Sequence, residues 1–66
     1  MRFHAQVHDE NNKAVFECHV IADNSGLARE KIKKYLREHN REQEAKMLIS
    51  LVEYREDIET KLLVIE

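Results

Sequence analysis

The sequence predicts a small α+β domain with two layers and the element order strand, strand, helix, strand, strand (ββαββ). Three observations support this fold class: two segments in which apolar and polar residues alternate, one helical stripe of apolar residues, and two further strand-like apolar segments. In chain order, the predicted elements cover about 2–8, 14–21, 25–40 (the helix), 46–55 and 60–65.

The chain has 66 residues, which corresponds to a single domain, 1–66, near the lower size limit for independent folding. It begins with Met1 and ends within a strand-like segment, so we expect a complete small gene product. No linker, repeat or proline divides it.

The first two strands are predicted to form a hairpin. Between them, Asn11 and Asn12 suit the two central positions of a type I′ turn. With that turn, each pair of opposed residues has numbers that total 23, which places His4 opposite His19 on one face. The same register gathers the apolar residues at alternate positions on the other face: Phe3, Ala5, Val7, Phe16, Cys18 and Val20.

The helix is predicted to begin after Asn24, because asparagine is a favoured N-cap residue. Asn40 is expected at its C-terminal cap. Spacings of three and four place one side of the helix on the core: Ala28, Ile32, Tyr35, Leu36 and His39.

After the helix, the third strand must run parallel to the second. We place it beside the first strand, and the fourth strand then completes a second hairpin through Glu56 to Glu59. This arrangement is a four-stranded antiparallel sheet of order 2-1-3-4. One helix covers only one face of this sheet, yet strands three and four are apolar on both sides. We therefore expect a second copy of the chain, or another protein, to cover the open face. The expected contact residues are Met47, Leu48, Ile49, Leu51, Val52, Tyr54, Leu63 and Ile65.

Charge is distributed unevenly along the chain. The formal net charge is −2, but residues 24–41 hold six basic and two acidic side chains, and the rest holds 5 basic and 11 acidic. A row at helical spacing could contact the phosphates of a nucleic acid: Arg29, Lys33, Arg37 and Arg41. Glu30 and Glu38 interrupt this face, and no exposed aromatic residue accompanies it, so we favour a solvated helix face.

The sequence holds four histidines. His4 and His19 are expected about 5 Å apart between their Cβ atoms, with Glu17 nearby, which could form a metal-binding or pH-responsive site. A third ligand is not evident, so we favour an ordinary polar strand face and expect no resident metal or other cofactor.

Catalytic motifs are not evident in the sequence. The single cysteine, Cys18, is expected in the core and excludes a disulfide within the chain, which favours a reducing, cytoplasmic compartment. The one glycine excludes a glycine-rich phosphate loop, and no apolar run approaches the ~18 residues of a membrane span. We therefore expect neither enzyme activity, a membrane partner nor a small-molecule substrate.

These observations predict a small, non-enzymatic interaction protein that forms a homodimer through the open sheet face and binds another macromolecule, as adaptors and inhibitors do. By analogy with small adaptors and inhibitors of this kind, we also expect an origin in a phage or mobile element. The alternatives are a nucleic-acid-binding module that uses the basic helix face and a metal- or pH-responsive module on the histidine pair.

Overall fold

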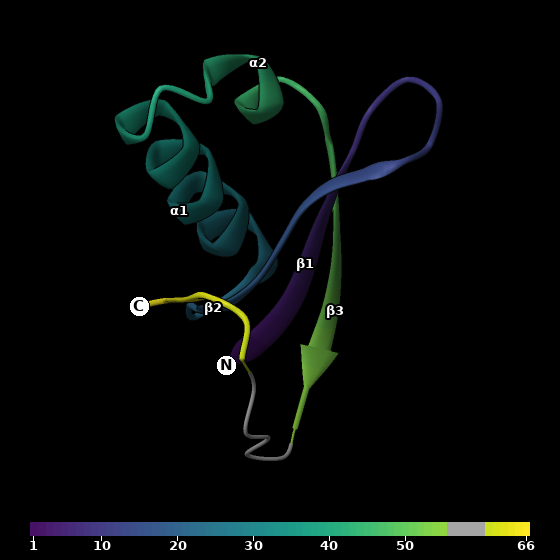
Figure 1. Ribbon diagram of the computed structural model, residues 1–66. Coiled ribbons are helices and arrows are strands. Elements are labelled where there is room, and N and C mark those ends of the chain that lie inside the picture. The colour runs from purple at the N-terminus through teal and green to yellow at the C-terminus, as the bar shows by residue number, and fades with distance from the viewer. Residues whose placement is uncertain (56–60) are drawn as a thin grey trace.

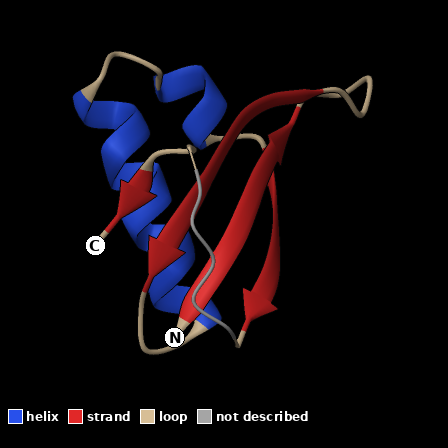
Figure 2. Ribbon diagram, turned by 60° about the horizontal axis from the view of Figure 1, so that its bottom comes forward, coloured by secondary structure: helices blue, strands red, loops and turns tan. Residues whose placement is uncertain are grey.

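The computed structural model describes residues 1–55 and 61–66. Its described elements form an α+β fold with helices on one side of a four-stranded sheet (Figures 1 and 2). They are β1 (Arg2–His8), β2 (Ala14–Ile21), α1 (Ser25–Glu38), α2 (Glu42–Ala45), β3 (Leu48–Tyr54) and β4 (Val64–Ile65).

The first hairpin confirms the predicted strand bounds and most of the predicted register. Phe3 pairs with Val20 and His4 pairs with His19, so opposed residue numbers total 23 as far as Val7. The register then shifts between Val7 and His8.

The turn of this hairpin explains the shift. Only Asn12 of the two asparagines has a positive φ, of 62°, whereas a type I′ turn requires two such residues. The carboxylate of Asp9 accepts hydrogen bonds from the backbone N–H groups of Asn11 and Lys13, each at 2.9 Å. Asp9 therefore stabilises a longer loop with one left-handed residue, which adds one residue to the second strand.

Helix α1 begins where predicted. The side chain of Asn24 accepts a hydrogen bond from the Leu27 N–H at 2.9 Å, so Asn24 is the N-cap residue. The helix ends at Glu38 and not at about residue 40 as predicted, and its C-cap residue is His39 and not Asn40. Asn40 follows the cap and turns the chain with a φ of 59°. The short helix α2 was not predicted.

The core lies between α1 and the sheet. Ala28, Ile32 and Leu36 of α1 are fully buried against the apolar face of β1 and β2. The predicted strand residues on this face, Phe3, Ala5, Val7, Cys18 and Val20, are buried, and Phe16 packs against them.

The third strand lies antiparallel beside the first, as predicted. The predicted order 2-1-3-4 is wrong in the place of the fourth strand, and the sheet is not purely antiparallel. The sheet has the order β3-β1-β2-β4, because β4 pairs in parallel with β2 and not with β3. His19 N–H donates to the Leu63 carbonyl at 2.8 Å, and Ile65 packs against the core. The predicted turn Glu56 to Glu59 lies outside the described residues. This arrangement covers the edge of β2 and leaves β3 at the other edge of the sheet.

Candidate interaction surface

The face of the sheet opposite the helices has one polar part and one apolar part. Both helices lie on the other face (Figure 2). Alternation along the paired strands places these residues on the open face: Arg2, His4, Gln6, His8, Glu17, His19, Ile21, Leu48, Ser50, Val52, Tyr54 and Val64. Most of the β1 and β2 members are polar, whereas β3 contributes exposed apolar side chains.

The apolar part of this face is concentrated on β3. Leu48 is 68% exposed and Val52 is 58% exposed, and both point to the side away from the helices. Since they are four residues apart on one strand, they project from the same face with only Ser50 between them. Their exposure on an edge strand makes β3 the strongest candidate binding surface among the described residues.

The structure divides the predicted contact residues between the two faces of the sheet. Leu48, Val52 and Tyr54 lie on the open face. The others belong to the helix side or to the loop before β4: Ile49 is buried in the core, Met47, Leu51 and Ile65 pack against it, and Leu63 is 40% exposed. The sequence pattern alone could not show which set remained exposed, because both sets are equally apolar.

The predicted histidine pair does come together, within a cluster of three rings. The ring centroids of His4 and His19 are 5.3 Å apart, and Tyr54 lies 5.8 Å from His4 and 5.4 Å from His19. His19 is only 4% exposed, and its Nδ1 accepts a hydrogen bond from Arg2 Nε at 3.1 Å. A ring nitrogen that accepts from a guanidinium carries no proton, so His19 is neutral in this arrangement.

The charges around His19 favour its neutral form. Burial lowers the pKa of the His19 imidazole, and the positive charges of Arg2 and His4 lower it further, while Glu17 opposes them. The hydrogen bond that Gln6 donates to Glu17, at 2.6 Å, is the main cause that lowers the pKa of the Glu17 carboxylate.

The geometry does not favour a metal ion between His4 and His19. Nδ1 of His19 already accepts from Arg2, and Nε2 of His4 lies 3.5 Å from Glu17 Oε1 without a hydrogen bond. Within residues 1–55 and 61–66, no group of three or more His, Cys, Asp or Glu side chains is arranged to hold a metal. The cluster is therefore better described as a packed polar patch of the sheet.

This patch leads to a prediction about pH. Because the folded pKa of His19 lies below its unfolded value of about 6.5, the unfolded chain binds this proton more readily. Stability from this group is fully present above about pH 6.5 and is lost as the pH falls through the folded pKa. We expect the free energy of unfolding, measured with urea between about pH 7.5 and 5, to fall as the solution is acidified. His19→Gln should show a weaker dependence over this range, and an unchanged dependence would contradict the assignment to His19.

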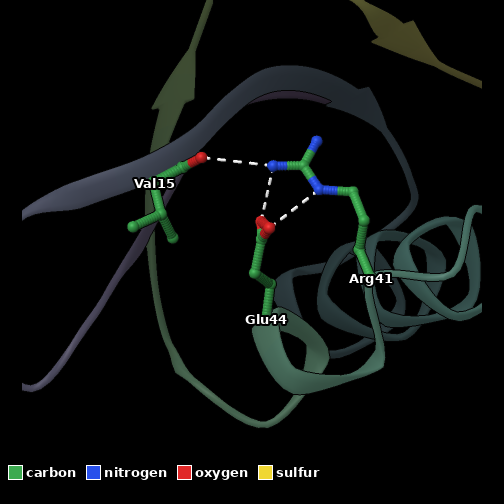
Figure 3. A network of polar contacts seen from close by, with 3 residues as sticks. All are labelled: Val15, Arg41 and Glu44. Carbon is green, nitrogen blue, oxygen red and sulfur yellow. Dashed lines mark hydrogen bonds and ion pairs between the residues drawn. The ribbon is translucent and has the colours of Figure 1, made fainter.

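The basic row on α1 is only partly available to a ligand. Arg29 and Arg37 are exposed, and Lys33 is half-buried. Arg41 instead lies beyond α1 and donates from Nε to Glu44 at 2.8 Å, with a second contact to the other carboxylate oxygen (Figure 3).

Arg41 also connects the helices to the sheet. One of its terminal nitrogens donates to the Val15 carbonyl at 3.2 Å, and its guanidinium lies 4.7 Å from the centre of the Phe16 ring. Phe16 in turn stacks on Tyr35 at 5.9 Å. These contacts indicate a structural role for Arg41, so the predicted phosphate-binding row retains three members and not four.

Cys18 lies on the inner face of β2 and is fully buried. Burial is the main cause that raises the pKa of its thiol to about 11, and the Glu17 charge contributes. The thiol is therefore protonated at neutral pH, so it is a poor nucleophile.

In the part of the chain that the structure describes, no helix is both long enough and apolar enough to cross a membrane. Comparison of the chain with protein-family models, with curated proteins and with solved structures finds no match.

Proposed function

We propose that this protein is a non-enzymatic interaction protein that binds a partner protein chain through β3. The observation that carries the proposal is the pair of exposed apolar side chains, Leu48 and Val52, on one face of an edge strand. Apolar groups that project together from an edge are typical of strands that receive a partner chain.

The chemistry of the other candidate groups supports a binding role over a catalytic one. The cysteine thiol is buried and protonated, and the histidine cluster is engaged in contacts with Arg2 and Tyr54. A buried free thiol also suits a reducing compartment, so we propose a cytoplasmic location. The proposed role is that of an adaptor or inhibitor.

The proposal predicts that partner capture depends on β3 and not on the helix. Immobilised protein would be incubated with a lysate of the organism that encodes it, and the retained protein and nucleic acid would be quantified. The variant Leu48→Asp with Val52→Asp should lose the retained protein, because it places two charges on the apolar binding surface.

The matched control is Lys33→Glu with Arg37→Glu on α1. It should retain the same protein as the wild type. The opposite result would contradict the proposal: the retained material is nucleic acid, the α1 variant loses it and the β3 variant keeps it. The protein would then be a nucleic-acid-binding module.

A further inference from the structure

We infer that the partner of β3 is a second copy of this chain, paired edge to edge in one defined register. This inference rests on the proposed function, since it names the occupant of the same surface. It follows from three properties of β3: its unpaired backbone, the distribution of its apolar side chains, and the charges at its ends.

The backbone directions along β3 follow from hydrogen bonds elsewhere in the sheet. The Ala22 N–H donates to the Met1 carbonyl at 3.0 Å, which makes odd-numbered residues of β1 face β2. The even-numbered residues of β1 therefore face β3, where Gln6 opposes Ser50. The hydrogen bond from His19 to Leu63 agrees, because it makes odd-numbered residues of β2 face β4.

It follows that the N–H and C=O groups of Ile49, Leu51 and Glu53 point away from the sheet. These groups point to the side of β3 on which the sheet has no further described strand, so the sheet offers them no partner there within residues 1–55 and 61–66. Three alternate residues with free donors and acceptors form a template for another antiparallel strand.

Apart from the charge of Glu53 near its end, β3 lacks the usual devices that protect an edge strand. It has seven residues, contains neither proline, glycine nor lysine, and pairs with β1 without a register shift. The strand at the opposite edge, β4, has two residues and so offers little backbone for pairing. Edge pairing is thus favoured on the β3 side.

Self-pairing about a two-fold axis at Ser50 matches the side chains on both faces. On the open face, each Leu48 lies opposite Val52 of the second copy. On the helix face, each Ile49 lies opposite Leu51 of the second copy. The odd-numbered residues then pair with one another, as hydrogen bonding requires, and the most exposed apolar side chains of β3 cover each other.

Neighbouring registers are less favourable. With the axis at Leu51, Val52 faces Ser50 and Ile49 faces Glu53. With the axis at Val52, Leu51 faces Glu53. Each of these two registers puts an apolar residue of the segment 48–52 opposite a polar or charged one, whereas the axis at Ser50 pairs the apolar residues of this segment only with one another.

The ends of the paired strands are also compatible. Glu53, the one charged residue of β3, falls opposite Met47 of the second copy, next to Lys46 in the sequence. Lys46 itself falls opposite Tyr54 of the second copy, so no like charges oppose each other at either end. Because the strands are antiparallel, the two α2 helices lie at opposite ends of the interface.

The register predicts a specific disulfide in the variant Ser50→Cys. In the inferred dimer the two copies of residue 50 form a non-hydrogen-bonded pair, with Cα atoms about 4.5 Å apart, within the range that a disulfide spans. Under mild oxidation of the full chain, followed by non-reducing electrophoresis, this variant should form a covalent dimer about 100-fold faster than a variant with a freely colliding thiol.

The controls separate this inference from the proposed function. Lys34→Cys, exposed on α1, reports random collision, and the wild type reports the buried Cys18 thiol. If Ser50→Cys is no faster than Lys34→Cys, or Leu51→Cys is faster than Ser50→Cys, the inferred pairing is wrong. If it is wrong while partner capture still depends on Leu48 and Val52, another protein occupies β3 and the proposed function stands.

Discussion

Replacing Ile32 with alanine is expected to lower the free energy of unfolding by about 2–5 kcal/mol. Ile32 is fully buried at the centre of α1, where it packs against the apolar face of β1 and β2. A domain of 66 residues has a total stability of roughly 3–10 kcal/mol. The variant should therefore be largely unfolded at 37 °C, or should unfold at a much lower urea concentration than the wild type. Circular dichroism would measure the fraction of unfolded protein.

The matched control for this substitution is Lys34→Ala, two residues along the same helix. Lys34 is exposed, and alanine favours a helix, so its effect should stay within about 0.5 kcal/mol. Equal effects of the two substitutions would contradict the placement of the core between α1 and the sheet.

The second large effect is expected on association. The double variant Leu48→Asp with Val52→Asp places carboxylates directly opposite each other at two positions of the inferred dimer. The loss of two apolar pairs and the repulsion of like charges should weaken dimerisation by about 3 kcal/mol or more, roughly 100-fold in Kd. Both positions are well exposed within one copy, so the monomer should remain folded. Sedimentation velocity would measure the loss of dimer.

A matched variant also introduces two charges into β3, but one is positive and the other is negative. In Leu48→Lys with Val52→Asp, each lysine faces an aspartate of the second copy, so attraction replaces repulsion. This variant should dimerise more strongly than the double aspartate variant. Equal association of the two variants would contradict the register with its axis at Ser50.

The first hairpin and α1 could be predicted because short-range signals determine them. Alternation fixes the bounds of β1 and β2, and the side chain of Asn24 fixes the start of the helix. The turn was predicted less well, because Asp9 stabilises a loop that the pair Asn11 and Asn12 does not by itself indicate.

The position of β4 could not be predicted in the same way. A hairpin with β3 and a parallel pairing with β2 use the same residues, Val64 and Ile65. The structure pairs β4 with β2, which adds Ile65 to the core beside α1. This contact joins residues far apart in the sequence, so no local pattern could reveal it. The role of Arg41 likewise depends on a contact with Val15, 26 positions earlier.

The candidate site was predicted in part. The apolar residues of the third strand were assigned to two faces, but the face that meets the helix could not be predicted. Only the side on which α1 and α2 lie decides that Ile49 is buried and Val52 is exposed. An Ile49→Asp substitution would therefore unfold the domain, whereas substitution of Val52 tests association. The proximity of His4 and His19 was predicted correctly, because it follows from the register of the hairpin.

The central claim is that the chain associates with a second copy through β3. Sedimentation velocity of the wild-type protein over a concentration series, from low micromolar to near millimolar, tests it most directly. We predict a concentration-dependent shift from monomer to dimer that ends at the dimer, and that the double aspartate variant removes. A wild-type protein that sediments as a monomer throughout, or whose dimer survives both aspartates, would contradict the claim.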